Sequence, residues 1–384
     1  KKTRPRVLLR PEGSPLAIGV DQLRKLKRDE PLDRMLSQLK SLKHAAAQAL
    51  LWLITGEETY ASCALKRMLQ YRFPGRVDTF HSYLRLTEFG LAYDWLYNWR
   101  GFTAERKAQV RKLILPLARH ALRTTYDHLF HNYIWMSAGG LALWALATAG
   151  EDKDPTEVFE NIRLRFNEGL FPGWKYLNGL PCEPMGYWAL YVFTPGLFTV
   201  LAAQSASEKD IVSLIRAEGN WLERAFENLI HSTLPNLRYI PWGDLQSGPN
   251  GGVTHEMAGA VDAATWALRS PHGAFFARRI EEKRGLRRYW GETAMYYVIY
   301  GRDLNVPAKV PPLSFFAGTE GGGHFVVRSS WEPDGVVGSF RCTDHFGDHN
   351  HYDQGSFMIY KDCLLYTSDA ADEGLGVDLG GRRI

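Results

Sequence analysis

The stretch NVPAKVPPLSFFAGTEGGG, residues 305–323, separates two parts of the sequence that differ in their pattern of apolar residues. It holds three prolines and four glycines, and both residue types interrupt helices. Before this stretch, apolar residues recur mostly at helical spacing. After it, short β-branched and aromatic runs alternate with turns. The stretch therefore predicts a boundary near residue 310 between a helical part and a β-sheet part.

The helical part contains many long segments joined by short turns rich in glycine or proline. Thr103 is a predicted N-cap with Glu105 in the first turn, and Gly56 is predicted to end the first long helix. This number of helices favours a toroid or solenoid over a four-helix bundle, although the sequence has no exact repeat period. The predicted segments are 32–56, 83–99, 103–122, 132–150, 185–204, 209–230 and 255–268.

The β part contains three strand-like runs with turns about every ten residues, a pattern typical of an antiparallel sheet. We therefore predict a mainly α protein in which a helical toroid (1–310) precedes an antiparallel β-sheet domain (311–365). The tail, residues 366–384, lacks strand alternation. We expect this tail to be non-native or disordered and the β domain to be truncated.

Composition excludes few classes of protein. The chain has 384 residues, 45% of them hydrophobic, so it can bury a large core and hold more than one domain. Its net charge of +4 is compatible with an anionic partner, and 13% aromatic residues are compatible with a sugar-stacking groove. No apolar run reaches the roughly 18 residues of a membrane span. The cysteines lack metal-site or disulfide-framework spacing; they are Cys63, Cys182, Cys342 and Cys363.

Six pieces of the chain, in order, resemble the heparinase II/III-type polysaccharide lyases. They are RPRVLLRPE (4–12), LAYDWLYNW (91–99), HNYIWMSAGGLALWALA (131–147), NGLPCEPMGYW (178–188), RSSWEPDG (328–335) and GDHNHYDQGSFMIY (347–360). The family pairs an (α/α) toroid with an antiparallel β-sandwich. The resemblance implies a periplasmic or secreted lyase that cleaves an anionic uronic-acid glycan, such as heparan sulfate or alginate. It implies neither a nucleic-acid nor a membrane partner.

The chemistry of such a lyase sets requirements for its site. β-Elimination removes the proton at C5 of a uronate and expels the sugar linked at C4. The C5 proton is too weakly acidic for a side chain to remove unless the neighbouring carboxylate is neutralised. The site therefore needs a carboxylate clamp, a base, and an acid for the leaving oxygen, and histidine and tyrosine can share the last two roles.

Two pieces supply candidates for the clamp and the acid. The resemblance implies that His131 and Asn132 grip the substrate carboxylate, although Asn132 is equally interpretable as a helix N-cap. It implies that Tyr187 is the acid and perhaps also the base, with Tyr191 as the rival. Pro184 stands where the family commonly has glycine, which puts the conformation of this loop in question.

The segment DHFGDHNHYD, residues 344–353, supplies the histidines. On a strand, residues two apart point to one face, so His349 and His351 are expected to share a side. The resemblance implies that His349 is catalytic and that His351 binds a structural zinc, which needs about four ligands. The family's further ligands come from downstream, where Asp369 is a doubtful substitute. His345 is interpreted as a loop histidine.

Other residues are candidate substrate contacts. Trp242 and Asp244 lie in the segment 238–252, either a cleft loop or a plain connector. Arg328 suits bidentate binding of a sulfate or carboxylate, or is an ordinary surface arginine. The full set is Glu183, Trp188, Tyr191, Trp242, Asp244 and Arg328.

Three other functions are alternatives to a lyase. A glycoside hydrolase needs two carboxylates that flank the glycosidic bond, and Glu183 and Asp244 are the only acidic pair that stands out for this role. A non-catalytic glycan-binding protein would keep the aromatic residues without using the tyrosine and histidines. A nuclease of the HNH type is suggested only by the letters HNH at residues 349–351 and lacks the ββα context.

Overall fold

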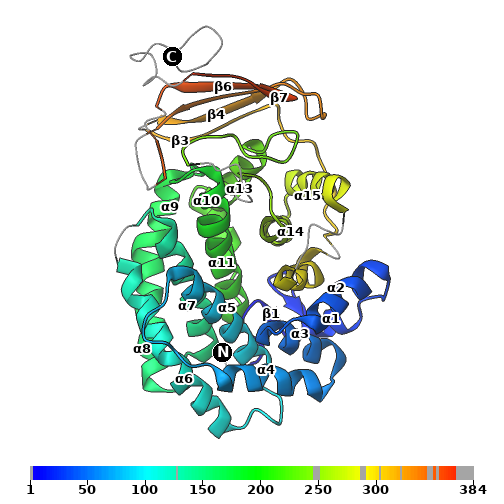
Figure 1. Cartoon of the computed structure of the whole chain (residues 1–384), viewed down its shortest axis with the longest axis vertical. Helices are drawn as coiled ribbons and strands as arrows, with labels where there is room; N and C mark the ends of the chain where they lie inside the picture. The colour runs from blue at the N-terminus through cyan, green and yellow to red at the C-terminus, as the bar shows by residue number, and fades with distance from the viewer. Residues whose placement is uncertain are drawn as a thin grey trace.

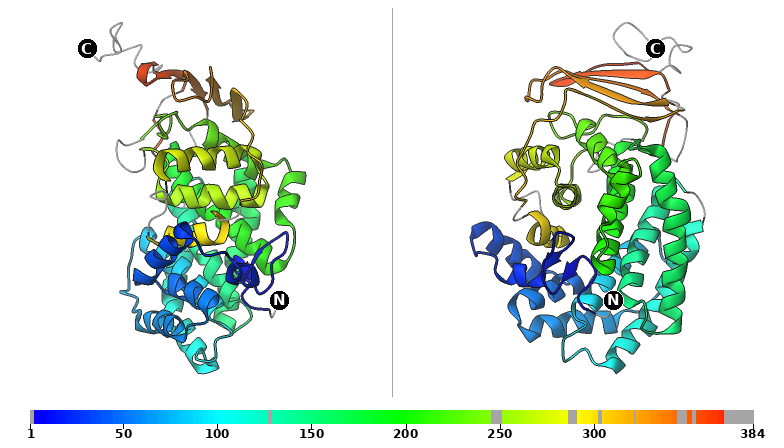
Figure 2. Two further views of the ribbon diagram at one scale, coloured as in Figure 1. Left: turned by 90° about the vertical axis from the view of Figure 1, so that its right-hand side faces the viewer. Right: turned by 180° about the vertical axis from the view of Figure 1, so that it is seen from behind.

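Among the described residues, helices predominate as far as residue 301, apart from a short parallel strand pair at residues 9–10 and 18–19, and a five-stranded sheet follows (Figures 1 and 2). The computed structural model describes residues 3–126, 129–244, 251–285, 291–301, 304–320, 322–343, 349–351 and 354–368. Its α-helices are α1 (Val20–Arg24), α2 (Glu30–Ser41), α3 (Ala45–Thr55), α4 (Glu58–Gln70), α5 (Thr79–Trp95), α6 (Ala104–Arg123), α7 (Asn132–Thr148), α8 (Lys153–Arg165), α9 (Phe171–Leu177), α10 (Met185–Trp188), α11 (Thr194–Ser207), α12 (Ile211–Ala217), α13 (Trp221–His231), α14 (His255–Leu268), α15 (Pro271–Arg284) and α16 (Ala294–Tyr296). The strands are β1 (Leu9–Arg10), β2 (Ile18–Gly19), β3 (Ser314–Thr319), β4 (Gly322–Arg328), β5 (Val337–Cys342), β6 (Ser356–Lys361) and β7 (Cys363–Ser368).

The inner helices form a ring. Contacts run from α3 to α5, α7, α11, α14 and α16 in turn, and α16 packs against α2, which returns to α3. Helices α4, α6, α8 and α15 lie outside these and pack against them. Figure 1 shows the two sides of this arrangement, with α6–α8 opposite α1–α3 and α14–α15. The predicted toroid is confirmed.

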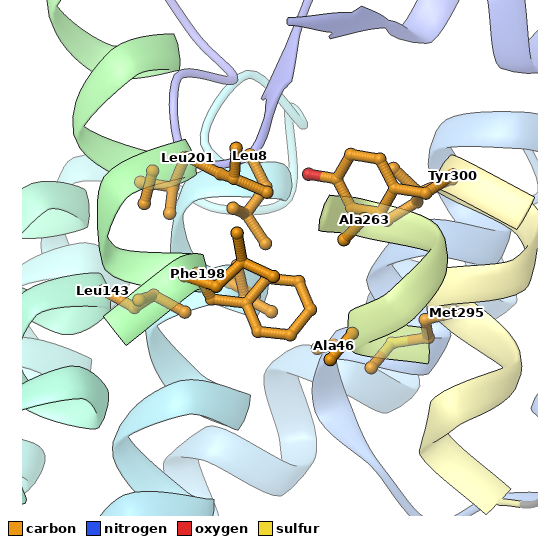
Figure 3. Packing of buried hydrophobic residues seen from close by; sticks show 14 of the residues in the cluster. Leu8, Ala46, Leu143, Phe198, Leu201, Ala263, Met295 and Tyr300 are labelled. Atoms are coloured by element: carbon orange, nitrogen blue, oxygen red, sulfur yellow. The ribbon is translucent and has the colours of Figure 1, made fainter. Parts of the chain in front are cut away.

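Burial explains which helices lie inside. In α7, fifteen of seventeen residues are buried, as expected for a helix that is apolar all round. The outer α4 and α8 bury only one face. A Cβ added at Gly90 of α5 would lie 2.8 Å from the backbone nitrogen of Trp144, so glycine permits α5 and α7 to pack this closely. Figure 3 shows residues from distant segments, including Leu8, Phe198 and Tyr300, meeting in one core.

Two predicted helices are each divided in the structure. The segment 32–56 forms α2 and α3, because Leu42 is extended and the side chain of His44 accepts a hydrogen bond from the backbone of Ala47 to cap α3. The segment 209–230 forms α12 and α13, separated where Asn220 adopts a left-handed conformation (φ 57°). The predicted N-cap at Thr103 and the helix end at Gly56 are confirmed.

One helix, Met185–Ser207, is long and apolar enough to cross a membrane by length and composition, which differs from the sequence expectation. In the structure 89% of its apolar window is buried inside the protein. This helix, which comprises α10, a π-helical segment at Ala189–Phe193 and α11, is therefore a core helix of the ring.

Strands β3 to β7 form an antiparallel sheet in sequence order. The inner face packs on the helical part through a small core, which contains Leu234, Ile240, Trp242, Val326, Val337, Met358 and Tyr360. The other face carries a row of phenylalanines that lie opposite one another on successive strands and are 38–52% exposed; they are Phe316, Phe325, Phe340 and Phe357.

The sheet extends past residue 365, where the sequence analysis places the end of the β domain. Strand β7 continues to Ser368, and its backbone pairs with β6 from Phe357 to Lys361. Because a cross-strand ladder satisfies backbone groups whatever the side chains are, the weak alternation in this segment concealed a strand. The rest of the predicted tail, residues 369–384, lies outside the described residues.

Candidate active site

Four segments that are distant in the sequence converge at one end of the ring. They are the start of α7 with His131, the turn leading into α10, the loop 242–244, and residues 349–351 before β6. Three come from the helical part, and the fourth comes from the β part. The site therefore lies at the junction of the two parts.

The side chains of Tyr187 and His349 stack directly on each other. Their rings are parallel, with an interplanar angle of 7° and centroids 3.9 Å apart. The pKa of the Tyr187 phenol is raised, first by loss of solvation and then by the negative charges of Asp244 and Glu183. Tyr187 is therefore a neutral proton donor at neutral pH.

Asp244 bonds to both histidines. His349 Nδ1 lies 3.0 Å from Asp244 Oδ2, and His351 Nε2 lies 2.6 Å from Asp244 Oδ1. These hydrogen bonds, His349 first, lower the pKa of the Asp244 carboxyl. Because an ionised carboxylate can only accept, Nδ1 of His349 carries a hydrogen. In the neutral ring, Nε2 of His349 is then left as a proton acceptor.

His131 presents the opposite tautomer. It is the N-cap of α7, and its Nδ1 accepts a hydrogen bond of 3.0 Å from the backbone N–H of Tyr133. A neutral His131 ring therefore holds its hydrogen on Nε2, which becomes a donor. The interpretation of Asn132 as the N-cap is wrong, because His131 occupies that position. The potential metal-ligand atoms of His131, Glu183 and His349 (one ring nitrogen from each histidine and one carboxylate oxygen) lie within 4.8 Å of one another.

Glu183 and Asn132 adjoin this group of side chains and are fully buried. Glu183 Oε1 accepts a 2.9 Å hydrogen bond from the backbone N–H of Asn132, which joins the turn before α10 to the start of α7. The side-chain amide of Asn132 has no hydrogen-bond partner among the described residues. A buried amide in this state is a natural partner for a polar ligand group.

Side-chain hydrogen bonds and one close glycine contact hold the segments together. Asn350 Nδ2 donates to the carbonyl of Cys182 at 2.8 Å, and Arg341 donates to Asn350 Oδ1 at 2.9 Å. Gly243 has φ +62°, and a Cβ there would lie 2.5 Å from both the His349 carbonyl oxygen and Pro184 Cγ. The turn before α10, the loop 242–244 and residues 349–351 are therefore packed in direct contact.

A cavity of about 570 Å³ opens among the inner helices beside this group. Tyr191 connects the two, since its ring lies 6.1 Å from that of Tyr187 and 5.1 Å from that of Phe80, centroid to centroid. Phe80 and Tyr191 line the cavity together with the ion pair His255–Glu256. Tyr191 therefore lies at the cavity wall, whereas Tyr187 lies against His349.

Three predicted substrate contacts are placed elsewhere. Trp188 is fully buried in the ring. Trp242 is buried in the small core, where its Nε1–H donates to His324 Nε2 at 3.3 Å. Arg328 is buried, and donates to the carbonyl oxygens of His231 and Thr233. All three side chains are buried, and none of them lines the cavity.

The expected strand geometry at the histidines is also wrong. Residues 349–351 precede β6, and His349 has a left-handed backbone (φ 66°). The two histidines nevertheless reach the same side, because both bond to Asp244. His345, Asp353 and Asp369 lie outside the described residues.

Sequence reasoning missed the residues that hold the site together. Asn350 is placed between the two singled-out histidines, but its bond to Cys182 spans 168 residues. Arg341 and Phe80 are ordinary strand and helix residues in the sequence. The only available signal was the position of Asn350 inside the histidine segment.

The residues beside His351 do not fit the structural zinc site that the resemblance implies. Within the described part of the chain, Asp244 is the carboxylate at hand, and such a site needs about four ligands. One group of three potential ligands was found among the described residues, namely His131, Glu183 and His349. His131 fits poorly there, because its Nδ1 already accepts a backbone N–H and a neutral ring then keeps Nε2 protonated.

No protein-family model matches the chain, and no curated protein matches it. Its fold does match solved structures. A heparinase III structure aligns with a TM-score of 0.52 and 14% identity over 83% of this chain and 48% of that chain. A second heparinase III structure aligns with a TM-score of 0.53 and 12% identity over 89% of this chain and 52% of that one. The chain thus has the fold of these polysaccharide lyases and spans about half their length.

Proposed function

We propose that this protein is a polysaccharide lyase that cleaves a uronic-acid glycan by β-elimination. The observation that carries the proposal is the stack of Tyr187 on His349, which sets a proton donor and a proton acceptor side by side. His131 lies next to them, with ring centroids of His131 and His349 6.2 Å apart. A clamp, a base and an acid are therefore available within one sugar-sized space.

Each residue has a role that follows from its hydrogen bonds. His131 Nε2–H donates a hydrogen bond to the uronate carboxylate and stabilises its charge, and the buried amide of Asn132 supports it. His349 Nε2 removes the proton from C5. The electron pair of the C5–H bond forms the C4=C5 double bond, and the C4–O bond breaks. Tyr187 gives its proton to the departing oxygen, a role that its raised pKa favours because the phenol stays protonated.

The cavity beside Tyr191 suits a sugar bound next to the cleaved bond. Its aromatic wall, Phe80 and Tyr191, offers stacking surface, and His255, Glu256 and Arg284 offer polar contacts. Pockets of several hundred Å³ accommodate small ligands. The heparinase III structures with the same fold favour a heparan-sulfate-like polymer among uronate glycans. A periplasmic or secreted location is part of the proposal, since such polymers are extracellular.

The geometry gives less support to a glycoside hydrolase or to a non-catalytic glycan-binding protein. A glycoside hydrolase would need Glu183 and Asp244 as its acid and base. Both oxygens of Asp244 bond to histidines, and Glu183 Oε1 accepts the N–H of Asn132. A non-catalytic glycan-binding protein would gain nothing from the opposed tautomers of His131 and His349.

The test is an assay of the purified chain on heparan sulfate, heparin, alginate and other uronate polymers. Elimination creates a C4=C5 double bond whose ultraviolet absorbance rises with time. Hydrolysis would release reducing ends without this absorbance, and a binding protein would retain the polymer unchanged. Reducing ends without absorbance, or no cleavage of any uronate polymer, would contradict the proposal.

A further inference from the structure

We propose that Asp244 is a positioning residue that fixes the tautomer and ring orientation of His349, with His351 restraining Asp244 from its other side. This inference rests on the proposed function, because it assigns a task to Asp244 within the same site. It replaces the predicted roles of Asp244 as a substrate contact and of His351 as a metal ligand.

The first observation is that both carboxylate oxygens and the backbone N–H of Asp244 bond to one short segment. Its two carboxylate oxygens bond to His349 Nδ1 and His351 Nε2, and its backbone N–H donates to the His349 carbonyl oxygen at 2.8 Å. Each oxygen of the carboxylate is therefore directed at one of the two histidines. Its partners lie 105 and 107 residues away in the sequence, so these bonds depend on the tertiary fold.

The second observation is that the loop carrying Asp244 is itself anchored. Trp242, two residues earlier, is buried against the sheet, and its indole N–H donates to His324. His324 in turn bonds to Ser339 on the neighbouring strand at 2.7 Å. Gly243 lies against both His349 and Pro184, at a spacing that leaves no room for a side chain. Asp244 is thus held by the sheet on one side and by the turn before α10 on the other.

The third observation is that the tyrosine stack alone does not define the tautomer. A flat stack restrains the plane of the His349 ring, but a ring flipped by about 180° about Cβ–Cγ would present the same flat face. Only a partner bonded to one ring nitrogen distinguishes the two orientations. Asp244 supplies that partner at Nδ1, so Nε2 remains the acceptor that β-elimination requires.

The primary test replaces Asp244 with asparagine and measures steady-state kinetics with the full chain. An asparagine can turn its NH₂ toward His349 Nδ1 and favour the wrong tautomer. We expect kcat to fall on the order of 100-fold or more, the kind of loss known for an orienting aspartate in other enzymes, with KM changed less than about threefold. Asp210→Asn is the matched control, because Asp210 only caps the remote helix α12 and its loss should leave kcat unchanged.

A second readout does not depend on turnover. Nitrogen-15 NMR of histidine-labelled protein reports which ring nitrogen carries the hydrogen, and His349→Gln assigns the signal. Wild type should show His349 protonated at Nδ1, and Asp244→Asn should lose that preference. His351→Gln, whose amide can still donate to Asp244 Oδ1, should keep the tautomer and lose less than about tenfold in kcat.

Two results would overturn the inference. One is an unchanged His349 tautomer in Asp244→Asn, and the other is a loss confined to KM, which would make Asp244 a substrate contact. If wild type forms no unsaturated product from any uronate polymer, the proposed function fails. The NMR comparison would then still decide whether Asp244 orients His349.

Discussion

The imidazole of His349 lies flat on the phenol of Tyr187, 3.9 Å away between centroids, and both project from segments that α7 and the sheet hold in place. One ring comes from the helical ring of the protein, and the other from the segment leading into β6. This pairing unites a proton donor of raised pKa with an acceptor nitrogen oriented by Asp244.

Removing the phenol hydroxyl should abolish elimination while leaving the polymer bound. In Tyr187→Phe the ring still stacks on His349, but no proton reaches the departing oxygen. We expect kcat to fall by about 100-fold or more, in the range of general-acid contributions, with the polymer dissociation constant nearly unchanged. Tyr191→Phe is the control, because Tyr191 lines the cavity and its variant should keep most of kcat. The reverse outcome would transfer the acid role to Tyr191.

The carboxylate clamp can be tested through the substrate. Methyl esterification of the uronate removes the negative charge that His131 is proposed to stabilise. His131→Ala should therefore slow cleavage of the free-acid polymer by about 10- to 1,000-fold, the range of one charge-stabilising donor, and slow cleavage of the esterified polymer much less. Initial rates on the two polymers give this ratio. Equal losses on both would exclude His131 as the clamp and favour Asn132.

Gly243 should be indispensable for the site but not for the fold. In Gly243→Ala the new Cβ meets the His349 carbonyl oxygen and Pro184 at 2.5 Å, so the loop must move away from the histidine. We expect kcat/KM to fall by about 10-fold or more, because misplacement of about 1 Å is costly to catalysis. Gly219→Ala is the matched control: Gly219 also has a positive φ (+105°), but nothing lies within 4 Å of its added Cβ. Similar activity losses in both variants would refute a local effect.

Two buried histidines should make the protein acid-sensitive. Burial, followed by nearby Arg328, lowers the pKa of His231 to about 3, and burial followed by Arg341 lowers that of His324 to about 3. Between pH 6.5 and 3 the unfolded chain binds more protons than the folded one, so stability falls as pH falls. Each histidine adds a slope of up to about 1.4 kcal/mol per pH unit.

Urea unfolding measured from pH 7.5 to 4.5 checks this slope. His231→Phe keeps a ring against Phe315 and Trp331, which the histidine contacts, but it cannot titrate. Its free energy of unfolding should depend less on pH than that of wild type, whatever its absolute stability. His120→Gln, at a half-buried helix position, serves as the control. An identical pH slope in wild type and His231→Phe would contradict the assignment.

Zinc should bind weakly to the chain as it stands. His351 is bonded to Asp244, and the described residues beside it provide too few ligands for a closed site. We expect less than stoichiometric zinc by elemental analysis after dialysis, and no change in thermal stability after chelation. Tightly held zinc at one ion per chain would show that other residues complete the site.

The boundary between the two parts was predictable because its signal is local. Proline and glycine between residues 305 and 323 act on the backbone where they stand, and helical spacing is likewise a property of neighbouring residues. The breaks at His44 and Asn220 were missed because each depends on one capping or left-handed residue inside an otherwise helical pattern. The helix propensity of a single residue is weak, and tertiary contacts determine whether the helix ends there.

The candidate site was predictable only for residues whose side chains can transfer a proton or bind a carboxylate and that lie in the pieces resembling the lyase family. Tyr187, His131 and His349 were singled out by resemblance, and the structure brings them together. The role of Asp244 was not predictable, since a hydrogen bond spanning 105 residues leaves no local trace. Arg328 and Trp242 were misassigned because sequence gives the character of a side chain but not its burial.

The hydrogen bond from Asn350 to the Cys182 carbonyl joins the β part to the ring within the site itself. Since His349 comes from one part and Tyr187 from the other, any subglobal opening that separates them dismantles the site while the helices stay intact. The working stability of the protein is then the free energy of opening this junction, which cannot exceed that of complete unfolding. In rising denaturant, function would disappear ahead of the helical signal, with the junction as the weakest cooperative unit.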